Sequence, residues 1–268
     1  PEEAHSYLTS LHSIIRYIGA STANMEEGSF RCDANISLRP FGSNQLGSKV
    51  EIKNVNSFRS VLRALKYEEK RQAAALDRGE KITQETRGWS DDQVITVPQR
   101  TKEYASDYRY FPEPDLPPIK IPRGWVTDIK SDVPELPTAK TKRYMLDLGL
   151  SKYDANLLAL DIEVAAFFDQ IVSEFMNTRN GLLKPRCKSA ANLINVELSR
   201  LTNETGLNLG KSNITPYSMS IIVLMLEENK LSSTTAKTLI QEIFENGGDP
   251  KVISKNLGLI QVLSLIHI

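Results

Sequence analysis

A strict alternation of apolar and polar residues from Phe30 to Arg39 is the feature that most limits how this chain can fold. Successive side chains of a strand point to opposite faces of a sheet, so the alternation predicts a strand with one buried and one polar face. A connection containing proline and glycine, residues 40–48, leads into a second alternation at residues 49–54. The two stretches together predict a long-looped antiparallel pair of strands.

The polar face of this strand pair carries a mixture of charges and amides. Its members are Arg31, Asp33, Asn35, Glu51 and Lys53. Carboxylates are ligands that Mg²⁺ prefers, and cationic side chains bind phosphate, so this face could hold a divalent cation and a phosphate group. A solvated sheet face crossed only by ion pairs has the same composition. The spacing alone leaves both interpretations open.

A helix is predicted to follow the strand pair, beginning at Asn56 or Ser57 and ending at Gly79, because Asn and Ser are good N-caps. Its predicted buried side consists of Phe58, Val61, Leu62, Leu65, Ala73 and Leu76. Its outer side carries a basic stripe, defined as Arg59, Arg63, Lys66 and Lys70. The basic stripe could contact the phosphates of an RNA backbone, or it could be a solvated face paired with Glu68 and Glu69.

The remaining pattern predicts strands first and helices afterwards. Residues 1–18 form an amphipathic helix pattern, with Ile18 on its apolar stripe, that Gly19 ends. Extended segments are predicted at residues 82–86, 94–97 and 104–111, and prolines exclude a helix between residues 112 and 118. Beyond Pro134 the pattern is helical only. The predicted helices span residues 138–148, 151–160, 161–177 and 184–204, with shorter ones beginning at Thr215, Ser232 and Asp249.

Two local features resemble ligand sites. The aromatic and charged run at residues 107–112 could stack a nucleic-acid base or simply fill the edge of a core. The stretch from Gly206 to Ser212 nearly spells a phosphate-binding loop. It has one residue too few between its glycines, and a helix precedes it where that loop needs a strand, so we interpret it as a linker.

The composition is typical of a globular protein. Lys plus Arg and Asp plus Glu both number 33, so any nucleic-acid contact must come from local patches. No apolar run approaches the roughly 20 residues that span a membrane. Cys32 and Cys187 have no CxxC partner, which indicates neither a disulfide framework nor a zinc site. These features indicate a cytosolic protein.

Four separated motifs, in order, resemble the GatB/GatE family, the B subunits of tRNA-dependent aspartyl/glutamyl amidotransferases. The motifs are EEGSFRCDANISLRP (26–40), KVEIKNVNSF (49–58), QETRGW (84–89) and DYRYFPEPDLPP (107–118). The resemblance implies an α+β fold. Residues 1–134 would be part of an antiparallel-sheet cradle similar to glutamine synthetase and guanidino kinases. A helical domain at 135–210 and a truncated, tRNA-binding tail domain at 211–268 would follow.

The resemblance also implies an activity. Members of the family use ATP and Mg²⁺ to phosphorylate the side-chain carboxylate of a mischarged Glu-tRNA(Gln) or Asp-tRNA(Asn), and ammonia then displaces the phosphate. The ammonia comes from an amidase (glutaminase) A subunit, and a small C subunit completes the heterotrimer. The expected location is the cytoplasm, or an organellar matrix in a eukaryote. Two alternatives stay open, a tRNA-binding module without chemistry and a structural partner of an amidase.

Site residues are carried over from the motifs one by one. Glu51 matches the family's metal-binding glutamate, and Asp33 and Glu27 are the next candidate metal ligands. Arg31 and Lys53 would neutralise the phosphoryl oxygens, while Asn35 and Asn54 would orient the nucleotide or substrate. The family's amino-terminal strands, which carry further metal ligands, are expected upstream of Pro1, and the apolar run 260–268 departs from the family. The chain by itself is therefore expected to be inactive.

Overall fold

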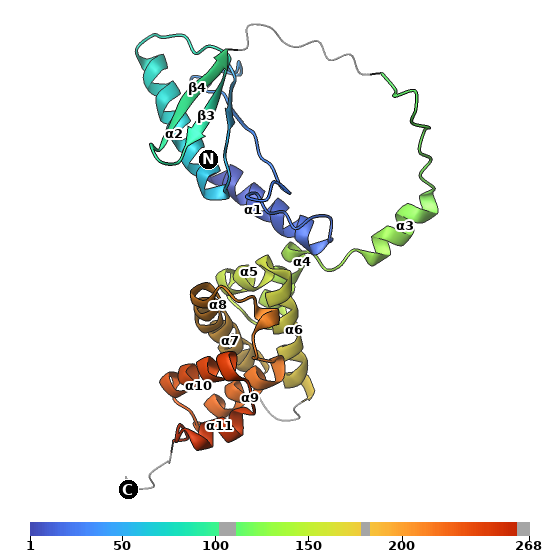
Figure 1. Ribbon diagram of the computed structural model, residues 1–268, viewed down its shortest axis with the longest axis vertical. Coiled ribbons are helices and arrows are strands. Elements are labelled where there is room, and N and C mark those ends of the chain that lie inside the picture. The colour runs from blue at the N-terminus through green and yellow to red at the C-terminus, as the bar shows by residue number, and fades with distance from the viewer. Residues whose placement is uncertain (102–110, 178–182, 262–268) are drawn as a thin grey trace. The chain divides into compact units, whose positions relative to one another are not determined.

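The computed structural model describes residues 1–101, 111–177 and 183–261. The chain divides into two compact units, Pro1–Pro134 and Glu135–Ile268, each with its own hydrophobic core (Figure 1). The amino-terminal unit combines helices with a sheet, and the described residues of the carboxyl-terminal unit form helices and their connections without a strand. The expected α+β class is therefore confirmed.

The amino-terminal unit contains a four-stranded sheet in the order β1-β2-β3-β4. Its elements are α1 (Glu2–Tyr17), β1 (Ala34–Ile36), β2 (Val50–Lys53), α2 (Phe58–Asp77), β3 (Glu85–Ser90), β4 (Ile95–Thr101) and α3 (Arg123–Asp132). Strands β1 and β2 pair antiparallel, as predicted, with Asn35 opposite Glu51. Strands β3 and β4 are also antiparallel.

Strands β2 and β3 run parallel, so the predicted antiparallel sheet is wrong at this pair. The reason is the 20-residue helix α2 that connects them. A crossover through a helix returns the chain to the starting edge of the sheet and so produces a parallel neighbour, whereas an antiparallel neighbour needs only a short turn. The sheet is mixed.

The predicted strand boundaries need correction. The ten-residue alternation yields only the three-residue strand β1, although Ala34 is buried and Asn35 exposed, as the pattern required. Strands β3 and β4 extend further along the chain than the predicted segments 82–86 and 94–97. Residues 104–110 of the predicted strand at 104–111, and residues 107–110 of the run at 107–112, lie outside the described residues.

Helix α2 covers one face of the sheet, and its N-cap is Ser57, one of the two predicted residues. Ser57 accepts a hydrogen bond from the Ser60 backbone N–H at 3.0 Å. The predicted buried side is only partly right, because Leu76 is 43% exposed and Ala73 is exposed too. The buried positions instead follow the helical spacing through Ser60, Val61, Ala64, Leu65, Glu68, Gln72 and Ala75. The core against them includes Leu8, Ile52 and Trp89.

The burial of Glu68 explains why the buried side of α2 differs from the predicted one. Its carboxylate, 0% exposed, accepts hydrogen bonds from Arg71 Nε at 2.9 Å, Gln72 Nε2 at 3.1 Å and Thr96 Oγ1 at 2.8 Å. Arg87 on β3 donates to the same Thr96 hydroxyl at 2.8 Å and lies 3.6 Å from Glu68. A buried carboxylate is tolerated only when cations and donors surround it, and here they come from both the helix and the sheet.

Two helices of this unit depart from the sequence pattern. Helix α1 packs through Leu8, but Ile18, which the pattern assigned to its apolar stripe, lies past its end and is exposed. Helix α3 follows the proline-rich segment and was not predicted. None of its residues is buried.

The carboxyl-terminal unit is a bundle of short helices, four of which begin where the sequence predicted a helix start. They are α4 (Pro137–Leu146), α5 (Lys152–Leu160), α6 (Ile162–Asn177), α7 (Leu183–Leu193), a π-helical turn (Ile194–Leu198), α8 (Ser199–Thr205), a 3₁₀ turn (Leu209–Lys211), α9 (Pro216–Glu227), α10 (Ser233–Asn246) and α11 (Pro250–Asn256). Ser151, Thr215, Ser232 and Asp249 cap α5, α9, α10 and α11 through their side chains. The segment predicted as one helix at 184–204 is helical but contains the π-helical turn.

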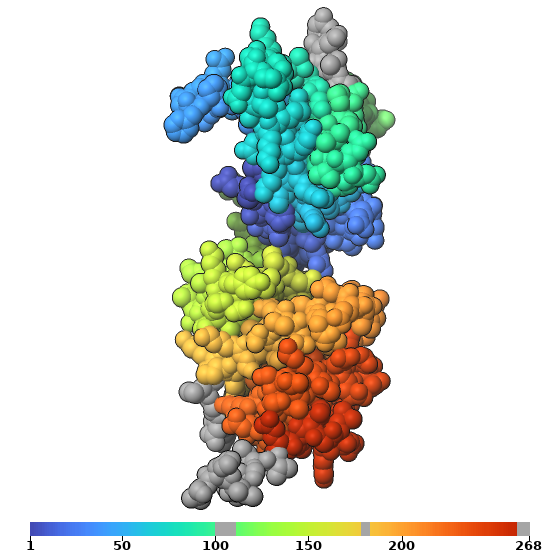
Figure 2. Space-filling model, turned by 90° about the vertical axis from the view of Figure 1, so that its left-hand side faces the viewer, coloured from blue at the N-terminus to red at the C-terminus, as the bar shows by residue number. Residues whose placement is uncertain are grey.

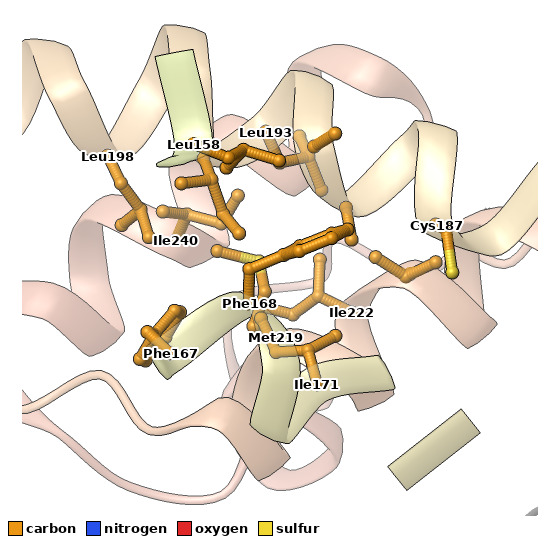
Figure 3. Close-up of a cluster of buried hydrophobic side chains, with 14 of the residues drawn as sticks. Leu158, Phe167, Phe168, Ile171, Cys187, Leu193, Leu198, Met219, Ile222 and Ile240 are labelled. Atoms are coloured by element: carbon orange, nitrogen blue, oxygen red, sulfur yellow. The ribbon is translucent and has the colours of Figure 1, made fainter. Parts of the chain in front are cut away.

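A single hydrophobic core runs through the carboxyl-terminal unit (Figure 3). Phe168 of α6 lies at its centre, with Leu158, Met219 and Ile240 from α5, α9 and α10 around it. Full burial of side chains of this size contributes roughly 1.5–3 kcal/mol each. The core includes residues from both sides of position 210, and the division into helical and tail domains there stays a prediction.

The connection Gly206–Ser212 is a linker, as interpreted from the sequence. Gly206 has a φ of 68° and ends α8, and residues 209–211 form the 3₁₀ turn. Among the helices that the structure describes, none is both long and apolar enough to cross a bilayer.

Candidate functional site

The face of the sheet opposite α2 carries four residues predicted to bind metal, nucleotide or phosphate. They are Asp33, Asn35, Glu51 and Lys53. Val50 and Ile52 point into the core and are fully buried, so their neighbours Glu51 and Lys53 project from the other face. Asn35 lies beside Glu51 on β1, and Thr86 lies beside it on β3. Asn35, Glu51 and Thr86 form a polar row across the sheet.

Lys53 lies between two carboxylates on this face. Its Nζ is 3.2 Å from Asp33 Oδ2 and 3.6 Å from Glu51 Oε1. The hydrogen bond that Lys53 donates to Asp33, together with the charges of Asp33 and Glu51, raises the pKa of Lys53, so its ammonium stays protonated at neutral pH. The structure thus brings Asp33, Glu51 and Lys53 together, as the sequence predicted.

Thr86 fixes the position of the Glu51 carboxylate. The Thr86 hydroxyl, on a residue that is 1% exposed, donates to Glu51 Oε2 at 3.0 Å. The other oxygen, Oε1, faces Lys53. Glu51 is itself 16% exposed, which leaves one side of the carboxylate accessible. Thr86 was not predicted, since only the parallel register of β2 and β3 brings it to Glu51.

Glu27 and Arg31, two further predicted site residues, make contacts in the turn that precedes β1. Glu27 is exposed in a turn where Asn24 Oδ1 accepts its backbone N–H at 3.4 Å. The Arg31 guanidinium lies over Gly28, 3.6 Å from where a Cβ on that glycine would be. Within residues 1–101, 111–177 and 183–261, no three His, Cys, Asp or Glu side chains converge as a metal site. Glu27 is therefore not brought to Asp33 and Glu51.

The donor set suits magnesium nonetheless. Mg²⁺ is commonly held by one or two carboxylates together with waters and substrate phosphates, and the polar face supplies two carboxylates beside a cation. Asn35 is exposed next to Glu51, and Asn54 is exposed at the end of β2 with a φ of 60°. Both amides can reach a molecule bound on this face.

The basic stripe lies on the exposed side of α2, the cyan helix at the surface in Figure 2. Lys66 pairs with Glu2 at 2.6 Å, and the hydrogen bond from Lys66 lowers the pKa of Glu2. Arg59, Arg63 and Lys70 have no ion-pair partner in the described part of the chain. The alternative in which the stripe pairs with Glu68 is wrong, because Glu68 is buried on the opposite side of the helix.

Fold and site together define a two-unit α+β protein. Its mixed sheet has a polar face with two carboxylates and a lysine, and a helical unit follows it. A family profile described as "GatB/GatE catalytic domain" matches residues 1–127, which contain the whole polar face. A second, described as "GatB domain", matches residues 167–266. The chain belongs to the GatB family.

Relatives that match almost the entire chain are named as the B subunit of the aspartyl/glutamyl-tRNA(Asn/Gln) amidotransferase. The protein of Dehalococcoides mccartyi strain 195 is 45% identical over 264 residues, covering 98% of this chain and 54% of the relative. That of Carboxydothermus hydrogenoformans is 43% identical, with 99% and 53% covered. That of Thermomicrobium roseum is 46% identical, with 98% and 53% covered. The chain thus spans about half the length of these relatives.

Proposed function

We propose that this chain is part of the subunit that activates a mischarged aminoacyl-tRNA for amide formation. The observation that carries the proposal is the polar row, in which Thr86 orients the Glu51 carboxylate and Lys53 lies beside it. The polar row falls within the segment that matches the family's catalytic domain. The substrate class follows the relatives' name, which specifies Asp- or Glu-tRNA amidotransfer.

The residues of the polar face suit phosphoryl transfer from ATP. Glu51 and Asp33 would hold Mg²⁺, which when bound neutralises phosphate oxygens and orients them. Lys53 and Arg31 would offset charge on the transferred phosphoryl group, and such positioned cations carry most of the catalysis in this kind of reaction. Asn35 would orient the substrate by hydrogen bonds.

The proposed reaction has two steps, phosphorylation of the substrate carboxylate by ATP and displacement of the phosphate by ammonia. A substrate carboxylate oxygen attacks the γ-phosphorus of ATP and ADP leaves, giving an acyl phosphate. Ammonia then attacks the acyl carbon, and phosphate leaves with that carboxylate oxygen. We propose that an amidase A subunit supplies the ammonia, that a small C subunit joins the assembly in the cytoplasm, and that residues 211–268 help to bind tRNA.

The test is amide formation by the full-length protein in its assembled complex. With Glu-tRNA(Gln) or Asp-tRNA(Asn) and added ammonia, we expect conversion to the amide only when ATP and Mg²⁺ are both present. RNA binding that is indifferent to ATP and Mg²⁺, without conversion, would instead indicate a binding module. Absence of both conversion and RNA binding would indicate a structural partner.

The basic stripe gives a prediction about tRNA affinity. Each phosphate contact releases condensed counterions, so removing contacts flattens the dependence of log affinity on log salt. Replacing Arg59 and Arg63 with Gln in the full-length assembly should reduce that slope by roughly one to two units. It should also weaken the binding of all cognate tRNAs to the same extent. Filter-binding titrations at several salt concentrations measure this slope.

The matched control replaces Arg39 and Lys81, two exposed cations outside α2, with Gln. We expect the control to retain the wild-type slope. If the Arg59 and Arg63 variant also retained it, the stripe would be a solvated face without RNA contacts.

A further inference from the structure

Gly88 lies at the middle of β3 on the polar face, with two side-chain amides close above it. It is the register partner of Lys53 on β2, and it is buried. A methyl group at Gly88 would lie 2.5 Å from Gln99 Nε2 and 3.3 Å from Asn54 Nδ2. The amides of Gln99, from β4, and of Asn54, from the end of β2, therefore converge on one point above the glycine.

Both the glycine and the backbone of Asn54 favour this arrangement. Because Gly88 has no Cβ, the Gln99 side chain can lie flat across β3 instead of standing away from the sheet. Asn54 has a φ of 60°, a left-handed conformation that Asn adopts more readily than most residues. Asn54 and Gln99 are both exposed residues, so a bound molecule could reach their amides.

The chemistry of this amide pair differs from that of its neighbours. Asp33, Lys53 and Glu51 are charged and suit a cation and phosphates, whereas each carboxamide offers an adjacent donor and acceptor without charge. A planar edge with a neighbouring donor and acceptor is the natural complement of a carboxamide, and the N6 and N7 atoms of adenine form such an edge.

The spacing also suits a nucleotide. Gly88 is one strand across and two residues along from Glu51, which corresponds to about 8 Å between backbone positions. A separation of that order is compatible with a base at one end and phosphoryl chemistry at the other. We propose that Asn54 and Gln99 recognise an adenine ring, either that of ATP or that of the terminal adenosine of tRNA. This inference rests on the proposed function and adds the specificity-determining residue Gln99 to it.

The experiment compares Gln99→Ala with Gln93→Ala, an exposed glutamine of the β3–β4 hairpin, in the full-length assembled protein. KM for ATP, KM for the mischarged tRNA and kcat are measured separately, and GTP is tested in place of ATP. Gln99→Ala should raise one KM about tenfold, the effect of losing one two-point contact to a base, while kcat changes less than twofold. Gln93→Ala should change neither KM.

The separate KM measurements and the comparison with GTP show whether the adenine belongs to ATP or to tRNA. A raised KM for ATP, with weaker preference for ATP over GTP, indicates the nucleotide. A raised KM for tRNA alone, with the preference for ATP unchanged, indicates the terminal adenosine. Unchanged values of both KM and of the nucleotide preference would overturn the inference while leaving ATP-dependent amide formation, and so the proposed function, in place. A wild-type reaction that did not need ATP would overturn the proposed function itself.

A second variant tests the geometry without removing Gln99. Gly88→Ala should displace the amide end of Gln99, which is flexible enough to move without disturbing the fold. It should therefore raise the same KM as Gln99→Ala, and combining the two should add little. Full additivity of the two effects would contradict a shared site.

Discussion

Replacement of Glu51 with Gln is expected to abolish ATP-dependent amide formation by the full-length assembled protein. The substitution removes the charge and keeps the shape, so the Thr86 hydroxyl can still donate to the remaining oxygen while the proposed cation loses a ligand. Removing one group that stabilises developing charge commonly costs about 10²–10³-fold in rate, and loss of a metal ligand should cost at least as much. Amidated tRNA is quantified with ammonia supplied directly.

The control for this prediction is Glu69→Gln on the exposed side of α2. It should leave amide formation unchanged, and the glutaminase activity of the proposed A subunit should be unaffected in both variants. Glu51 is partly exposed and its contact with Lys53 is long, so the fold should lose little stability. Near-normal conversion by Glu51→Gln would show that the carboxylate is not part of the reaction.

Replacement of Glu68 with Ala is expected to destabilise the amino-terminal unit by about 3–5 kcal/mol. The reason is that the substitution removes a fully buried carboxylate to which Arg71, Gln72 and Thr96 donate hydrogen bonds. It also leaves the nearly buried Arg87 with Glu85, at 3.0 Å, as its remaining carboxylate partner, and breaking a buried ionic network by removing one member carries a penalty of this size. Both tryptophans, Trp89 and Trp125, lie in this unit, so their fluorescence in a denaturant titration follows its unfolding. Glu69→Ala, one residue along and exposed, should change stability by less than about 0.5 kcal/mol.

The stability contribution of Glu68 is also expected to depend on pH. Burial by itself raises the pKa of Glu68, but the hydrogen bonds from Arg71, Gln72 and Thr96 outweigh it and lower the pKa below the ordinary value of 4.5. The charged form therefore stabilises the fold above pH 4.5, and this contribution is lost as the pH falls through the lowered folded-state pKa. The stability difference between the wild type and Glu68→Gln should narrow on acidification below pH 4.5. A difference that stayed constant down to about pH 3 would contradict this role of the buried network.

The elements that the sequence predicted well are those governed by local rules. Alternation placed Glu51 and Lys53 on one face because Val50 and Ile52 had to be buried, and the cap at Ser57 marked the start of α2. Capping residues likewise marked the starts of α5, α9, α10 and α11 in the carboxyl-terminal unit. These signals depend on residues within one or two turns of each other.

The elements that the sequence missed depend on contacts between distant segments. Thr86 and Gln99 reach the polar face only through the register of β3 with its neighbours. A glutamate on an amphipathic helix is ordinarily assigned to solvent, and nothing near Glu68 in the sequence shows that Arg87 and Thr96 will surround it. The π-helical turn at Ile194–Leu198 leaves the apolar pattern almost unchanged and has no local signal of comparable strength.

Whether the polar face of the sheet supports activation of a carboxylate by ATP is tested most directly by following an oxygen atom. Glu-tRNA(Gln) or Asp-tRNA(Asn) labelled with ¹⁸O in the side-chain carboxylate is incubated with the full-length assembled protein, ATP, Mg²⁺ and ammonia, and the released phosphate is analysed by mass spectrometry. We expect one ¹⁸O atom in the phosphate for each amide formed, and no labelled phosphate from the Glu51→Gln variant. Amide formation accompanied by phosphate without ¹⁸O would contradict activation through an acyl phosphate.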